Sequence, residues 1–217
     1  MKNAPYAITI SRQLGSGGSY IGQCIAKRMG IHYLDREILS EAAQRLQVSE
    51  HDLDEYDEKA ASFWQILFST EFVDTVAYHP PKLFVPSVSN VFETQTEIIN
   101  KVADERSAVF IGRGGNYILR NRPRHLSIFI HAGIPFRQER VADLYEVPEK
   151  QALKMIEQYD NERAKYIRQI AGNAWTDARN YQLCIDTGLI GLDNAVKMII
   201  NYIKDKFGVR EIHPEMG

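Results

Sequence analysis

The chain has 217 residues, a formal net charge of −2 and 44% hydrophobic residues. This length allows one large core, or a core with an inserted segment, and the small charge provides no long-range attraction to nucleic acid or to an anionic membrane. No apolar run reaches the length of a membrane span, and no apolar signal core precedes the first expected strand, so we expect a cytoplasmic protein with neither of these partners.

The cysteines and histidines indicate neither a disulfide framework nor a metal site. Cys24 and Cys184 lie far apart, each in an apolar segment, which predicts buried free thiols. The six histidines are scattered and are never paired with each other at helical spacing. We therefore expect no tightly bound metal.

The first expected elements are a buried strand over residues 6–11 and a helix over residues 19–29, joined by a glycine-rich turn. Glycines permit positive φ and close backbone approach, so successive N–H groups can face an anion, and the N-terminus of the helix adds partial positive charge. A glycine turn alone is often only a tight connection, but this one follows a strand and opens a helix. The residues predicted to bind phosphate or nucleotide are Gly15, Ser16, Gly17, Gly18, Ser19 and Tyr20.

The loop lacks the lysine of the GxxxxGK[ST] phosphate-binding pattern, because Gly18 stands in its place. That lysine normally neutralises charge on the β- and γ-phosphates. Arg12 stands where the pattern begins with glycine, and we expect it to supply charge from the other side of the loop. Ser19 retains the hydroxyl that would face a Mg²⁺ ion accompanying a nucleotide.

Further apolar runs alternate with helical patterns. Strands are expected at residues 32–34, 107–111, 126–131 and 183–186, and helices at 91–105, 134–144, 148–170 and 192–207. This alternation predicts an α/β fold in one domain over residues 1–217: a five-stranded parallel sheet with helices on both faces. Ligands bind such sheets beyond the carboxyl ends of the strands, where Asp35, Arg36 and Arg113 follow two of the runs.

Two regions interrupt the alternation. Residues 49–90 are acidic and then aromatic, which predicts a helical insert; its aromatic residues between Trp64 and Phe84 fit a satellite core or a homodimer contact better than a base-stacking site. Residues 136–176 alternate basic and acidic residues. Such a stretch is usually a solvated helix face, but in this fold it predicts a lid.

The order of these motifs resembles the cytidylate kinases, and more closely the divergent cytidylate kinase-like family. The resemblance rests on the glycine loop, the Tyr33-Leu34-Asp35 step, the Gly112-Arg113 pair and the D-x-x-R-x-x-Y stretch from Asp160. Trp175-x-Asp177 and Leu183-Cys184-Ile185-Asp186-Thr187 complete it. The match covers nearly the whole chain. It implies a nucleoside monophosphate kinase fold of the P-loop type, with a monophosphate-binding insert and a closing lid.

The resemblance also implies roles for individual residues. Asp35, Arg36, Arg113 and Asp160 would bind the acceptor, Arg12, Arg163 and Arg168 would be catalytic, and Arg137 and Arg140 would belong to the lid. An i,i+3 helix-surface ion pair is the alternative reading of Asp160 and Arg163. The acid that follows the family's Gly-Arg pair is Gly114 here, which argues against a preference for cytosine.

The implied activity is transfer of the γ-phosphate from ATP with Mg²⁺ to a nucleoside monophosphate or a similar small phosphate acceptor. Three alternatives stay open. One is a nucleotide-binding regulatory protein that kept the fold and lost catalysis together with the lysine, and another is a loop that binds only inorganic phosphate or sulfate. The third is an unrelated structural or interaction module that uses the aromatic insert, which leaves the arginines at the strand ends unexplained.

Overall fold

The computed structural model describes residues 4–35 and 88–212. The strands are β1 (Ala7–Arg12), β2 (His32–Leu34), β3 (Ala108–Ile111), β4 (His125–His131) and β5 (Leu183–Asp186). The helices are α1 (Gly18–Met29), α5 (Val88–Glu105), α6 (Gly115–Ile118), α7 (Ile134–Tyr145), α8 (Glu149–Ala171), α9 (Thr187–Ile190) and α10 (Leu192–Phe207), with a 3₁₀ turn, η1, at Ala178–Asn180.

The five strands form one parallel sheet in the order β2-β3-β1-β4-β5, as the alternation of elements predicts. The central strand β1 is buried over its first five residues, and all four residues of β3 are buried. Parallel strands covered on both faces read as continuous apolar runs, which is why the sequence pattern identified them.

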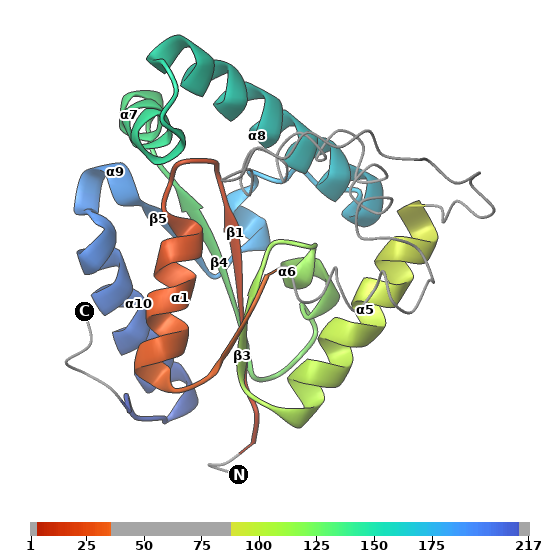
Figure 1. Cartoon of the computed structure of the whole chain (residues 1–217). Helices are drawn as coiled ribbons and strands as arrows, with labels where there is room; N and C mark the ends of the chain where they lie inside the picture. Colours follow the sequence, from red (N-terminus) through yellow and green to blue (C-terminus); the bar gives the residue numbers. More distant parts are fainter. Residues whose placement is uncertain (1–3, 36–87, 213–217) are drawn as a thin grey trace, which may run out of the picture.

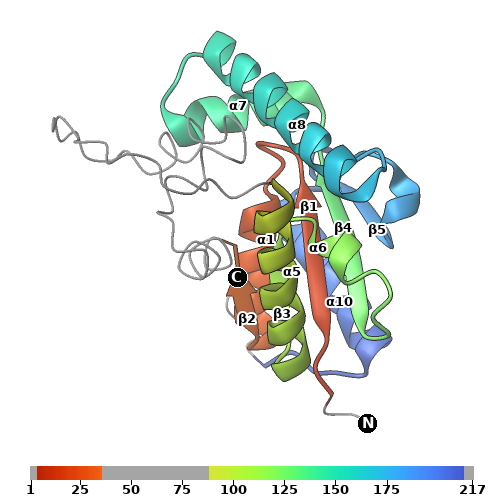
Figure 2. The same ribbon diagram turned by 90° about the vertical axis from the view of Figure 1, so that its right-hand side faces the viewer.

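Helices cover both faces of the sheet (Figure 1). On one face α1 and α10 pack over Ile8 and Ile10, and on the other α5 and α6 lie over Ala7 and Phe110. Helices α7 and α8 lie beyond the carboxyl ends of the strands, as the turned view shows (Figure 2). The loops that follow β1 and β3 therefore meet α7 and α8 at one edge of the sheet.

Most expected boundaries agree with the observed elements to within one to three residues, and Gly30 caps α1 in a left-handed conformation with φ of 61°. Most of the expected insert at 49–90 lies outside the described residues, and its last three residues open α5. The lid region at 136–176 corresponds to most of α7, all of α8 and the turn after it. Both cysteines are free, but Cys24 is half-buried and Cys184 is exposed, because β5 forms an edge of the sheet. The prediction of buried thiols was wrong.

Candidate functional site

The glycine loop, residues 13–19, is shaped by glycines that contact neighbouring elements closely. Gly15 and Gly17 have φ of 79° and 82°, a conformation that side chains disfavour. A β-carbon at Gly15 would lie 2.7 Å from the carbonyl oxygen of Arg137, and one at Gly17 would collide with Leu192. The loop is thus held between α7 and α10.

Hydrogen bonds fix the inner side of the loop. The Ser16 hydroxyl lies 2.8 Å from the carbonyl oxygen of Gln13 and 3.1 Å from that of Ile130, and the Ser16 carbonyl accepts a 2.8 Å bond from the Thr187 hydroxyl. The Ser16 side chain therefore supports the loop. The first N–H groups of α1, those of Gly18, Ser19 and Tyr20, have no acceptor within the helix and are the groups suited to a phosphate.

Gly18, at the position of the missing lysine, is covered by the side chain of Arg12. A β-carbon on Gly18 would collide with Cβ of Arg12, and one on Gly112 would collide with Nη1 of the same side chain. Gly18 does not have a positive φ, so its backbone would accept a side chain. The Arg12 side chain is what requires glycine here, and it extends from the glycine loop to the loop after β3.

The side chains of Tyr33 in β2 and of Asp35 just after it lie beside the Arg12 guanidinium group. Nη2 of Arg12 lies 3.7 Å from Oδ1 of Asp35, and the Tyr33 hydroxyl donates a 3.3 Å hydrogen bond to Oδ2 of Asp35. Burial first, and then the Asp35 charge, raises the pKa of Tyr33 to about 12, so this phenol stays neutral. The Ser19 side chain lies close enough to the Tyr33 hydroxyl to act against the rise in the pKa of Tyr33.

Asp160 of α8 joins the glycine loop to helices α7 and α8. Its Oδ1 accepts a 2.9 Å bond from the Leu14 N–H and lies 3.4 Å from Nη1 of Arg163, and its Oδ2 accepts a 2.6 Å bond from Arg137. Arg137 is buried, at 4% exposure, and also donates to the carbonyl oxygens of Leu14 and Ala132. The i,i+3 pair of Asp160 and Arg163 is therefore part of a mostly buried network and not an isolated pair on the helix surface.

Arg163 brings a second cation to Arg12. Its Nη1 donates a 3.2 Å bond to the Arg12 carbonyl oxygen, and its side chain is 20% exposed. Burial and then the nearby Arg12 charge lower the pKa of Arg163 to about 10, although Asp160 acts in the opposite direction. Two neighbouring positive charges favour a bound anion.

The loop after β3 has an unusual backbone. Gly112, Arg113 and Gly114 all have positive φ, of 67°, 52° and 66°, and left-handed backbone at a non-glycine residue such as Arg113 often marks a functional site. A β-carbon at Gly114 would lie 2.5 Å from Ile170 of α8 and 3.4 Å from Phe92 of α5. This loop, α5 and α8 therefore meet closely.

Sequence reasoning missed Gln95 as a partner of Tyr166. Gln95 lies on α5, is 1% exposed and accepts a 3.2 Å hydrogen bond from the Tyr166 hydroxyl. Gln95 stands at helical spacing with Val91, Ile98 and Val102, so the apolar periodicity of α5 could have indicated a buried amide. The Tyr of the D-x-x-R-x-x-Y motif thus ties α8 to α5.

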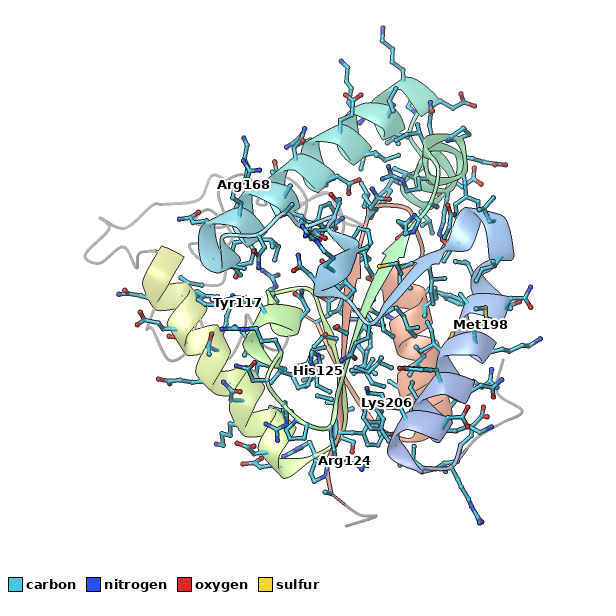
Figure 3. The ribbon with its side chains drawn as sticks, turned by 180° about the vertical axis from the view of Figure 1, so that it is seen from behind. Tyr117, Arg124, His125, Arg168, Met198 and Lys206 are labelled. Carbon is cyan, nitrogen blue, oxygen red and sulfur yellow. The ribbon has the colours of Figure 1, made fainter. Side chains whose placement is uncertain are left out.

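The remaining candidates are less closely associated. The Tyr20 side chain lies beside Cys24 and Asp193, which leaves its N–H for phosphate. Arg140 is partly buried, and its Nε has no hydrogen-bond partner in the part of the chain that the structure describes. Arg168, labelled in Figure 3, is exposed on α8 and the structure does not bring it to the loop. Arg36 lies outside the described residues.

Neither a metal cluster nor a spanning helix accompanies this site in residues 4–35 and 88–212. Within these ranges no group of three or more His, Cys, Asp or Glu side chains is placed to hold a metal ion. No helix within them combines the length and apolar character that crossing a membrane requires.

A parallel sheet with a glycine loop between its central strand and the first helix defines an α/β protein of the P-loop kinase type. The chain belongs to the cytidylate kinase-like family, whose model matches residues 7–189. This membership, predicted from the motifs, is confirmed. No curated protein matches the chain.

Solved structures share the fold. An uncharacterised protein from Eubacterium ventriosum is 27% identical with a TM-score of 0.69, over 92% of this chain and 99% of that one. Shikimate kinase from Bacteroides thetaiotaomicron is 11% identical with a TM-score of 0.51, over 92% and 98%. Family and fold together support a nucleotide-binding phosphotransferase in general terms.

Proposed function

We propose that this protein transfers the γ-phosphate of ATP to a nucleoside monophosphate or a similar small phosphate acceptor. The observation that carries the proposal is the position of Arg12, which covers Gly18 and extends to Gly112. A guanidinium group there provides the charge that a lysine at position 18 would bring to the phosphates. Arg12 would thus supply, from the other side of the loop, the positive charge that the lysine supplies in the usual pattern.

In the proposed mechanism the donor phosphates lie along the N–H groups of Gly18, Ser19 and Tyr20, at the positive end of α1. The Ser19 hydroxyl would face the Mg²⁺ ion, which when bound neutralises phosphate charge. Arg12 and Arg163 stabilise the equatorial oxygens of the transferring group.

The acceptor is proposed to lie against the loop after β3, with its phosphate on Arg113 and Arg36. Its phosphate oxygen is already ionised near neutral pH, so positioning replaces a general base. Gly114 offers no acid to a cytosine ring, so we leave the acceptor's base open. Arg140 is the lid residue with hydrogen-bonding capacity to spare at Nε, whereas Arg137 already holds the loop.

The test is ADP release from ATP and Mg²⁺ with a panel of nucleoside monophosphates. We expect turnover with at least one acceptor and a fall in kcat of about 10²–10³-fold in Arg12→Ala, the usual loss for one such electrostatic contact. The double variant Arg12→Gly/Gly18→Lys should recover part of the activity that Arg12→Gly loses, because only glycine at position 12 removes the β-carbon that a side chain at position 18 would meet. Arg106→Ala, in an exposed ion pair, is the control.

Two outcomes would contradict the proposal. Unchanged rates in both Arg12→Ala and Arg163→Ala would remove the proposed catalytic roles. Silence across the whole panel, together with calorimetric binding of ATP and of a monophosphate, would favour a nucleotide-binding regulatory protein, which is the alternative that the absent lysine suggests.

A further inference from the structure

A groove lined by many polar side chains lies apart from the glycine loop, and no residue assigned above to phosphate or acceptor binding lines it. Ile167, Ala171 and Asn173 on its wall belong to the expected lid region. Its volume is about 280 Å³, and it lies between α6, the first half of β4, the C-terminal end of α8 and the segment around η1. Figure 3 shows the molecule from this side, with Tyr117 and His125 labelled. The volume is near the lower limit of small-molecule pockets, so a ligand here would be small.

Buried polar side chains line the groove. His125, Ser127 and Asn116 are 3%, 6% and 8% exposed, and all three are lining residues. Oδ1 of Asn116 has no hydrogen-bond partner among the residues that the structure describes. A buried amide oxygen without a donor is costly, so a ligand that supplies one would be favoured.

The histidine adds a neutral group to this lining. Its Nε2 lies 2.8 Å from the Thr9 hydroxyl, and burial, followed by the Lys206 charge, lowers the pKa of His125 to about 4. The ring is therefore uncharged near neutral pH. The positive charge of the groove comes instead from arginines at its rim.

Two arginines and no carboxylate line the groove. Arg179 is held by Asp177 through contacts of 2.7–3.1 Å, which offset its charge. Arg120 stacks 3.9 Å above the Tyr117 ring and donates to the Tyr117 carbonyl oxygen. Its guanidinium group is exposed and is the main cation available to a ligand.

We propose that this groove binds a small organic anion that carries hydroxyl groups, of the size of a sugar phosphate or a hydroxy acid. The anionic group would pair with Arg120. The Asn116 amide would turn to bring its buried Oδ1 to a ligand hydroxyl, and Oδ1 of Asn180 and Nε2 of Gln182 would bind others, since Nδ2 of Asn180 and Oε1 of Gln182 already have partners. The groove shares no residue with the glycine loop, so binding here can be followed separately from the proposed phosphotransfer.

The experiment is a titration of the full chain, followed residue by residue in ¹H–¹⁵N NMR spectra, with ribose 5-phosphate, with citrate and with neutral ribose. We expect saturable shifts of the Tyr117, Arg120 and Gln182 amides with at least one of the two anions, and weaker binding of ribose. Arg120→Gln and Asn116→Leu should each weaken binding about tenfold, the usual size for one charge-assisted hydrogen bond. Asn201→Leu, at an exposed position of α10, should leave it unchanged.

The proposal is overturned if neither anion gives saturable shifts, if ribose binds as tightly as the anions, or if the shifts are confined to the amides of Gly15–Ser19. It is also overturned if Arg120→Gln binds like the native chain. Arg120 is exposed, so this variant tests the charge without disturbing the core. Phosphotransfer assays are not involved, and failure here leaves the proposed function unaffected.

Discussion

At the residue scale, Gly18 is restricted to glycine by the β-carbon of Arg12, which lies over it. Glycine is usually required by a positive φ, but Gly18 lacks one and is restricted only by the arginine packed over it. Any side chain at position 12 would fill this space, and the arginine also extends its guanidinium group to Gly112. A glycine that replaces a catalytic lysine is informative only together with the side chain that fills its space.

Gly114 illustrates the opposite case, in which the backbone itself restricts the residue. Gly114→Asp would place a side chain at φ of 66° and within 2.5 Å of Ile170. We expect a loss of about 1–2 kcal/mol from the left-handed backbone and more from the collision. Urea unfolding would measure the loss of stability. The double variant Gly114→Asp/Ile170→Ala should recover only the part of the loss that comes from the collision. A single variant as stable as the native chain would show that the loop adapts.

His125 predicts a pH dependence of stability. Its folded pKa of about 4 lies below the unfolded value of about 6.5, so the unfolded chain binds more protons between these values. Its contribution is thus fully present above about pH 6.5 and is lost as the pH falls toward 4. The loss between pH 7.5 and 5 should be roughly 2 kcal/mol.

His125→Gln removes this titration, so the difference in unfolding free energy between pH 7.5 and 5 should shrink by that amount. Urea melts of both proteins at the two pH values provide the measurement. Parallel pH profiles for the two proteins would mean that His125 is not held neutral.

At the element scale, α7 and α8 act as a support for the glycine loop. Asp160 connects the Leu14 N–H to Arg137 and Arg163, so a change in either helix is transmitted to the phosphate side of the loop. We propose that this network orders the loop before any nucleotide binds. Asp160 would then position the loop in addition to any contact with an acceptor.

Asp160→Asn tests this support. It keeps the shape of the side chain but leaves two arginines without its charge, and we expect a loss of about 2–4 kcal/mol, because breaking a largely buried pair is costly. The variant should also bind ATP more weakly, since the Leu14 N–H loses its charged acceptor. Denaturant unfolding and calorimetry measure the two effects, with Arg106→Ala as a surface control. Native-like values for both would exclude a supporting role.

The elements themselves were predictable, whereas this network was not. Buried parallel strands and amphipathic helices leave local patterns, so their positions could be derived from the sequence. Asp160 and Arg163 also fit a solvated helix face, and their partner Leu14 lies 146 residues from Asp160, a separation that no local spacing encodes. The order of the motifs thus predicted which loops form the site. The contacts between those loops and α8 could be found only in the structure.

At the scale of the whole molecule, the strand order brings distant segments to one edge. β1 pairs with β3 on one side and β4 on the other, so the glycine loop and the loop after β3 lie side by side although about 100 residues separate them. A ligand that contacts both loops would stabilise the folded chain as a unit. Ligand-induced stability is therefore a global measure of the proposed site.

ATP with Mg²⁺ should raise the melting temperature of the native chain. At a concentration about 100 times Kd, binding stabilises the folded state by about 2.7 kcal/mol, which corresponds to roughly 5–10 °C for a chain of this size. Arg12→Ala should reduce the shift and Arg106→Ala should retain it, because only Arg12 lies at the loop. Differential scanning fluorimetry with sodium sulfate at the same ionic strength separates nucleotide binding from simple anion binding. If sulfate stabilises the chain as much as ATP does, the loop is only an oxyanion site; if Arg12→Ala shifts as far as the native chain, Arg12 does not replace the lysine in binding the donor.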